Sequence, residues 1–232
     1  MNLHNKITSA SLVWLCVFMV SISISSARTD PEQWQQIDTV DGVSLFRSLK
    51  ESGDLLPFKA ITTLDIAYQK IVMTLVDAEM KNTWAPKLKA ITLHNQISAN
   101  QFEYSEYYAT PWPFYDREFL LNGTVEYLSD RVIMSAQNSG KKQLADADHL
   151  LANVHKIEIE IIPLAPDRTE VAFTFSGDLG GWIPDFVKHI IQKKWPVRFI
   201  QAMERHINNS SSLVTDRYLA LEKKDLIISN RP

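Results

Sequence analysis

Two charged residues in the middle of the chain stand among apolar ones and are the first candidates for chemistry. Arg117 opens a predicted strand over 117–128 and is in phase with its apolar residues, while Glu106 is in phase with Tyr104 and Tyr108 on the strand before. Alternate residues of a strand share a face, so both charges are expected among apolar side chains. A buried charge is costly unless it is paired. We therefore predict that Arg117 and Glu106 share one buried polar network. Such a network marks either the polar end of a cavity or a structural element. If its role is structural, Arg117 would bind carbonyls of the loop before it.

Other residues with catalytic or ligand-binding side chains carry weaker signals. His155 heads the apolar face of a predicted strand over 154–162, where either a ligand oxygen or a neighbouring core group would satisfy its ring. Asp146, Asp148 and His149 are metal-ligand types, but their spacing matches no known metal site, so no metal is predicted. The sequence contains neither a GxSxG or HExxH catalytic motif nor a GxGxxG or GxxxxGK[ST] phosphate loop. We expect no cofactor and favour a binding protein over an enzyme.

Composition further restricts the class of protein and the kinds of partner. The chain has 232 residues, of which 45% are hydrophobic and 22% charged, and this balance is typical of a globular domain. The formal net charge of −3 argues against nonspecific binding to nucleic acid, which needs a basic surface. We expect a single domain over 28–232 and a monomer.

The first 27 residues have the pattern of a signal peptide. Lys6 precedes an apolar stretch that is densest over Leu12–Val20, and Ser25 and Ala27 provide small residues at the −3 and −1 positions of a cleavage site. Serines interrupt the stretch, which disfavours the alternative of a membrane anchor of about 20 apolar residues. We therefore predict cleavage after Ala27 and export to the periplasm or the exterior. Cys16, the only cysteine, lies in this segment, so the mature chain would have no disulfide.

Hydrophobic spacing predicts strands followed by a long helix. Alternating strands with one apolar face indicate an antiparallel sheet, and a final amphipathic helix would cover that face, giving an α+β helix-grip domain. A helix between residues 66 and 84, capped by Asp65, either continues to its end or breaks near Asp77, and Pro196 should kink or divide the final helix. The predicted elements are helical turns at 34–37 and 145–152, strands at 43–48, 58–64, 91–97, 101–109, 117–128, 132–137, 154–162 and 169–176, and a final helix from Pro184.

Two segments resemble StAR-related lipid-transfer (START) domains. Pro111-Trp-Pro-Phe-Tyr-Asp-Arg-Glu-Phe119 is similar to the family's Pro-aromatic-Pro and Arg-acid signature, with Glu118 where the family more often has Asp, and Gly181-Trp-Ile-Pro184 resembles its closing segment. The resemblance extends from Trp34 to about Leu221. It implies an incomplete barrel that grips a C-terminal helix around a hydrophobic tunnel holding one lipid, such as a sterol or phospholipid. The alternatives are an enzyme of the same fold, acting as a cyclase or hydrolase on a hydrophobic substrate, and an interaction domain with a filled core.

The tunnel would lie between the sheet and the final helix. Gly180 and Gly181 would form the hinge of a gate, and the basic residues Lys188, Lys193, Lys194 and Arg198 could make transient contact with a membrane surface. The candidate ligand-binding residues are Arg117, Glu106, Tyr104, Tyr108, Phe119, Leu121, His155, Ile157, Phe173, Phe175, Val187 and Ile191.

Overall fold

The computed structural model describes residues 34–49, 57–110 and 113–210. All of them belong to one unit, Glu32–Pro232, and none to the unit Met1–Pro31. The predicted signal peptide, and Pro111 and Trp112 of the START-like signature, lie outside the described residues. In the part of the chain that is described, no helix combines the length and the apolar character needed to cross a membrane.

The described strands form one ten-stranded sheet. Its order is β1-β2-β3-β10-β9-β7-β6-β5-β4, with every pair along this path antiparallel, and β8 adds a parallel pair beside β6. The predicted strands all exist, and the strands at 43–48 and 58–64 have the predicted bounds. The strands are β1 (Trp34–Val40), β2 (Val43–Ser48), β3 (Phe58–Leu64), β4 (Leu88–Ser98), β5 (Gln101–Tyr108), β6 (Arg117–Tyr127), β7 (Val132–Asn138), β8 (Leu150–Leu151), β9 (Asn153–Ala165) and β10 (Arg168–Asp178).

The helical turn predicted at 34–37 is wrong, because these residues begin strand β1. Asp41 and Gly42 both have positive φ, 50° and 78°, as a two-residue hairpin turn requires. This turn folds β1 back onto β2, with Val40 opposite Val43 and Trp34 opposite Ser48. The backbone pairing therefore overrides the helical spacing of Trp34 and Ile37.

Two short helices follow β3. The break predicted near Asp77 is confirmed: α1 covers Tyr68–Val76 and α2 covers Ala78–Trp84, and the Asp77 carboxylate caps α2 by accepting a hydrogen bond from the Met80 amide at 3.1 Å. Asp65 is not the N-cap of α1, because that helix begins later, after Ala67.

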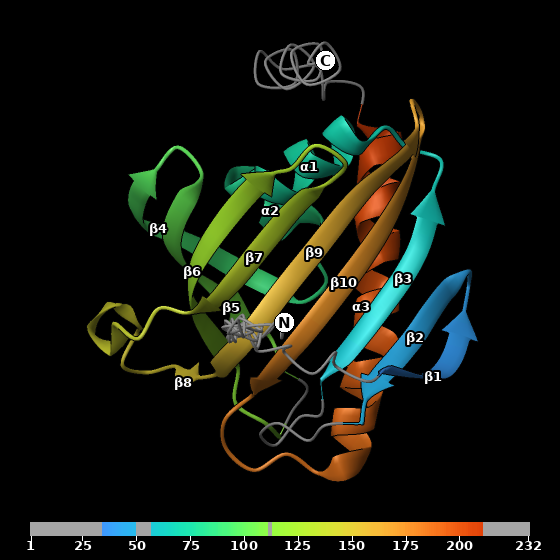
Figure 1. Cartoon of the computed structure of the whole chain (residues 1–232). Coiled ribbons are helices and arrows are strands. Elements are labelled where there is room, and N and C mark those ends of the chain that lie inside the picture. Colours follow the sequence, from blue (N-terminus) through green and yellow to red (C-terminus); the bar gives the residue numbers. More distant parts are fainter. Residues whose placement is uncertain (1–33, 50–56, 111–112, 211–232) are drawn as a thin grey trace, which may run out of the picture. The chain divides into compact units, whose positions relative to one another are not determined.

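A single long helix, α3 (Asp185–Asn209), ends the described chain. Figure 1 shows α3 behind the curved sheet, on the same side as α1 and α2. Pro196 lies inside α3 without dividing it, because the turn around it is held by packing: Pro196, Val197, Phe199 and Ile200 are buried. The predicted α+β helix-grip fold is confirmed.

The connection between β7 and β9 differs from the prediction. The helical turn predicted at 145–152 is wrong: a 3₁₀ turn covers Lys142–Leu144 and the short strand β8 covers Leu150–Leu151. Strand β8 lies against the first two residues of β6, where Leu150 pairs with Arg117 and Leu151 with Glu118. The sheet's backbone groups at this end thereby gain partners that a helical turn would not offer.

Aromatic rings pack between α3 and the strands β3 and β10. The Phe58 ring stacks on Phe175 at 5.4 Å, and Trp195 of α3 lies 5.3 Å from Phe173 and 5.9 Å from Phe199. Rings at these separations add packing energy beyond the burial of their area. This aromatic cluster attaches the middle of α3 to the sheet.

Candidate functional site

Arg117, the first residue of β6, joins two loops at one end of the sheet. Its side chain is buried, with 4% exposed, and it donates hydrogen bonds to the carbonyl oxygens of Tyr115, Leu179 (Nε, 3.4 Å) and Gly180 (Nη2, 3.2 Å). Burial lowers the pKa of this guanidinium. The alternative in which Arg117 binds loop carbonyls is confirmed. Through these hydrogen bonds Arg117 connects the β5–β6 loop to the loop before α3.

Glu106 carries a second buried charge, in β5. Lys81 of α2 approaches its Oε1 to 2.5 Å, and the Tyr108 hydroxyl donates to its Oε2 at 2.7 Å. Burial, and then the Glu106 carboxylate, raise the pKa of Tyr108 well above its usual value, so this hydroxyl keeps its proton. Burial likewise raises the pKa of Tyr104. Lys81, Glu106 and Tyr108 form one polar cluster, called here the interior triad.

The predicted pairing of Arg117 with Glu106 is wrong. The two residues do share a face, since Tyr108 lies opposite Arg117 and Glu106 opposite Phe119 in the ladder between β5 and β6. Among the described residues, however, no ion pair joins them, because each charge has nearer partners: loop carbonyls for Arg117, and Lys81 for Glu106. Strand phase predicted the shared face, but it could not predict a lysine arriving from a helix.

The apolar candidates lie where strand and helix phase predicted them. The Tyr108 ring, for example, contacts the Phe119 ring at 5.3 Å and the Trp195 ring at 6.2 Å, so the interior triad faces the aromatic cluster. Leu121, Phe173 and Phe175 are fully buried, and Val187 is half-buried. The other half-buried candidates pack against this core: Tyr104, Tyr108, Phe119, Ile157 and Ile191.

His155 is exposed, so neither the core role nor the cavity role predicted for it is correct. Val154 pairs with Gly177 and Lys156 with Ser176, which leaves His155 as the extra residue of a bulge in β9. The bulge turns the ring outward, where its Nε2 lies 3.3 Å from Nδ2 of Asn153.

Trp84, at the end of α2, is a candidate that the sequence reading missed. Its side chain is buried against Phe199, and its indole Nε1 has no hydrogen-bond partner in the described part of the chain. A buried N–H without a partner is costly, and a ligand oxygen would satisfy it. Lys81 and Trp84 are three residues apart and so share a helix face, the signal that could have pointed to both.

Solved structures with this arrangement of sheet and helix are known. A STAR-related lipid transfer protein from Xanthomonas axonopodis matches with a TM-score of 0.66 and 18% identity, over 76% of this chain and 99% of that one. Human StAR-related lipid transfer protein 5 matches with a TM-score of 0.71 and 14% identity, over 78% and 89% of the two chains. Human STARD10 matches with a TM-score of 0.71 and 15% identity, over 86% of this chain and 82% of that one.

The protein has the START-domain fold. A scan of the sequence against protein-family models finds no match, and neither does a comparison with curated proteins. The assignment therefore rests on the structure and agrees with the resemblance seen in the two sequence segments.

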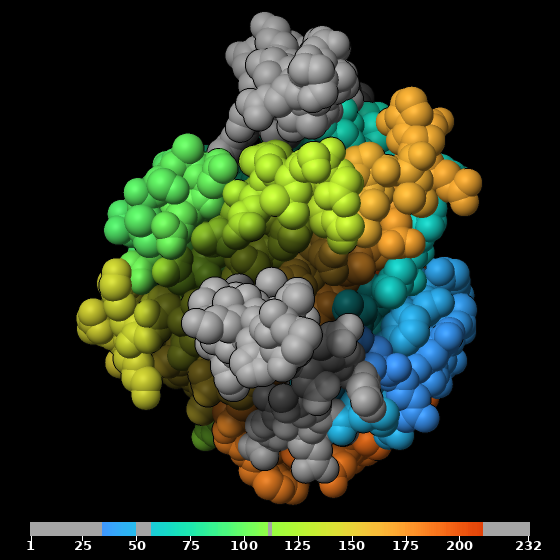
Figure 2. Space-filling view, in the orientation of Figure 1, coloured from blue at the N-terminus to red at the C-terminus, as the bar shows by residue number. Residues whose placement is uncertain are grey.

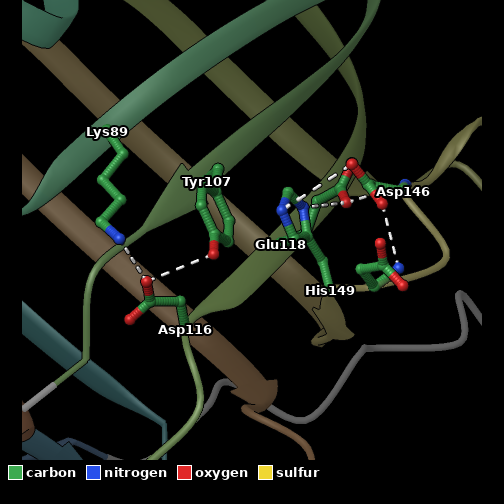
Figure 3. Close-up of polar contacts among 7 residues, drawn as sticks. Lys89, Tyr107, Asp116, Glu118, Asp146 and His149 are labelled. Atoms are coloured by element: carbon green, nitrogen blue, oxygen red, sulfur yellow. Dashed lines mark hydrogen bonds and ion pairs between the residues drawn. The ribbon is translucent and has the colours of Figure 1, made fainter. Parts of the chain in front are cut away.

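On the outer face of this START fold, a second polar cluster holds loops to the sheet (Figure 3). Asp116 accepts hydrogen bonds from Lys89 Nζ at 2.5 Å and from the Tyr107 hydroxyl at 3.2 Å, and the Lys89 bond is the main cause of the lowered pKa of Asp116. The Tyr107 ring stacks on His149 at 3.7 Å, and His149 Nδ1 lies 2.9 Å from Oε2 of the buried Glu118. These contacts fix the β5–β6 and β7–β9 connections on either side of Arg117.

The same outer cluster contains the residues weighed as metal ligands. The Asp146 amide donates to Glu118 at 3.0 Å, and the Asp148 amide donates to Asp146 at 2.9 Å, so these residues order the loop. The described ranges contain no group of three His, Cys, Asp or Glu side chains arranged to hold a metal ion.

The segment that leads into α3 exposes large apolar side chains. Trp182 and Phe186 are 79% and 65% exposed, and across the loop Tyr115 is 80% exposed. The Trp182 ring lies 6.2 Å from Phe114, so the two loops that Arg117 joins also meet through their aromatic residues. Figure 2 shows the start of α3, in orange, below the strands of the sheet. We call Tyr115, Trp182 and Phe186 the aromatic rim.

The glycines proposed as a hinge are held by close contacts. Gly180 and Gly181 have φ of 71° and 66°, and a Cβ on Gly180 would lie 2.8 Å from the Leu151 carbonyl oxygen. Alanine at Gly180 would strain the backbone and clash with β8. Replacing both glycines therefore cannot test a hinge alone, because the change would also disturb the folded loop.

Proposed function

We propose that this protein binds one lipid beneath α3 and carries it between membranes. The START fold supports this proposal. The observation that carries it is the interior triad: this polar cluster lies against the aromatic interior, and a molecule with polar and apolar parts would match both surroundings. The unpartnered Nε1 of Trp84 adds a donor for a ligand oxygen. Each methylene of a buried chain contributes about 0.8 kcal/mol, so an ordinary acyl chain suffices for tight binding.

Filling the space beneath α3 tests this function. Val187 is half-buried in the first turns of α3, and Val187→Trp is expected to abolish lipid binding while the circular dichroism spectrum stays unchanged. Native mass spectrometry of protein purified from its own host measures the bound lipid. Ile190→Trp, at an exposed site one turn along, is the matched control and should retain lipid.

Three results of this experiment would contradict parts of the proposal. Wild-type protein without any lipid would contradict the function, and Val187→Trp with a full load of lipid would contradict the position beneath α3. Chemical conversion of the recovered lipid would favour the enzyme over the carrier.

The aromatic rim is proposed to make transient contact with membranes. Exposed Trp, Tyr and Phe side chains insert at the boundary between head groups and acyl chains. Trp182→Ser combined with Phe186→Ser is therefore expected to slow lipid transfer between vesicles at least about tenfold, with little change in equilibrium binding. Leu164→Ser, an exposed apolar residue near the end of β9, is the control and should leave the rate unchanged. An unchanged rate in the double variant would show that the rim does not meet the membrane.

Export is also part of the proposal, and it rests on the sequence of residues 1–27. The first residue of the exported chain decides it: Arg28 supports cleavage, whereas Met1 on membrane-held protein contradicts it.

A further inference from the structure

A groove with a volume of about 440 Å³ lies between the strand pair β1–β2 and the helix α3. This volume is within the range of small-ligand sites. Its described lining includes cationic side chains and no acidic one. This β1–α3 groove is lined by Gln35, Gln36, Ile37, Arg47, His189, Gln192 and Lys193.

Arg47 supplies to this groove a positive charge that no carboxylate of the described ranges pairs with. Gln35 Oε1 accepts hydrogen bonds from Arg47 Nε at 3.2 Å and from Nη2 at 3.0 Å, which holds the planar guanidinium in place. Among the described residues, no carboxylate forms an ion pair with Arg47. A guanidinium held in this way is suited to a carboxylate or phosphate ligand.

Lys193 provides the second cation from the opposite wall. Within the described part of the chain its ion-pair partner is Asp38, at 3.4 Å, and both side chains are substantially exposed. Exposed ion pairs at such distances contribute little energy, so an incoming anion could compete for Lys193.

The groove adjoins the apolar interior. In the β2–β3 ladder Arg47 lies opposite Phe58, so the two side chains share a face of the sheet. The Phe58 ring lies 6.3 Å from Trp195, and Ile37 packs against the core. A ligand with its anionic end at Arg47 would therefore have its other end directed toward the aromatic cluster.

We propose that the β1–α3 groove binds the anionic head group of an amphiphile, with Arg47 and Lys193 as its charge partners. The placement of the tail rests on the proposed lipid-binding function, whereas the anion site rests on the groove itself. The proposal narrows the ligand class to lipids that carry a carboxylate or phosphate.

Isothermal titration with three probes tests this assignment. Decyl phosphate has the anionic head and a tail, decanol has the same tail without charge, and inorganic phosphate has the charge without a tail. Wild-type protein is expected to bind decyl phosphate at least about tenfold more tightly than either of the other probes. One charge-assisted hydrogen bond contributes a factor of this size to affinity.

Substitutions in the full chain then locate the site. Arg47→Gln should weaken the binding of decyl phosphate about tenfold and leave the binding of decanol unchanged. Asp38→Asn should strengthen the binding of decyl phosphate, because the substitution removes the carboxylate that pairs with Lys193. Lys194→Gln, which removes the same charge from the neighbouring residue outside the groove lining, is the matched control and should have no effect.

Each contrary result has a distinct meaning. Equal binding of decanol and decyl phosphate, or equal losses in Arg47→Gln and Lys194→Gln, would overturn the anion site while leaving the lipid function intact. If inorganic phosphate binds as tightly as decyl phosphate, the groove is a site for free anions, and the claim that its ligand is an amphiphile is contradicted. If none of the three probes binds, this inference fails, whereas the proposed lipid function is decided separately by the native mass spectrometry described above.

Discussion

Arg117→Met is expected to lower the free energy of unfolding by about 3 kcal/mol, because it leaves three carbonyl acceptors without their charged donor. The carbonyls belong to Tyr115, Leu179 and Gly180, so the β5–β6 loop and the loop before α3 would lose their connection. Urea unfolding followed by circular dichroism measures the change.

Two further variants make that result specific. Arg117→Lys should recover only part of the loss, since one ammonium group cannot reproduce the planar fork of a guanidinium. Arg131→Met removes an arginine that is one-third exposed and pairs with Asp130 and Glu160, and it should cost less than about 1 kcal/mol. Equal losses at Arg117 and Arg131 would mean that the buried contacts of Arg117 contribute no special stability.

The second large effect is expected at the interior triad. Lys81→Met and Glu106→Gln should each destabilise the fold by about 3 kcal/mol, because the first leaves the buried Glu106, and the second the mostly buried Lys81, without its counter-charge. The double variant should lose less than the sum of the two, with a coupling of at least about 1 kcal/mol. Chemical denaturation of the four proteins gives this value.

A parallel cycle distinguishes the observed pair from the one that the sequence suggested. Arg117→Met combined with Glu106→Gln should show a smaller coupling than the Lys81–Glu106 cycle, since their charges have separate partners. If Glu106 is coupled to Arg117 and not to Lys81, the assignment of the triad is incorrect.

The sequence predicted the fold well because the strands have one apolar face and their turns have clear signals. Alternation places Phe173 and Phe175 on the inner face. Asp41-Gly42 is a turn signal before the strand at 43–48, but it does not show that the residues before it form a strand and not a helical turn. The error arose because Trp34 and Ile37 are spaced as in a helix, whereas pairing with β2 decides their conformation.

The site was less predictable because it depends on contacts between elements. Phase along a strand shows that Glu106 points inward, but not that Lys81 will reach it from α2. It places His155 with the isoleucines of β9, but a one-residue bulge reverses that placement. The β1–α3 groove joins residues more than 140 positions apart, and no local pattern contains that information.

The order of strands also has a consequence for how the chain folds. Strand β3 lies beside β10, and at this junction the Thr169 hydroxyl donates to the Ile66 carbonyl across 103 residues of sequence. The N-terminal hairpin can join the sheet only after β10 exists, so the entropy of closing that long loop must be lost before the pairing is gained. Refolding is therefore expected in milliseconds to seconds, as for other non-local β topologies, with β3 exposed to proteases until late in folding.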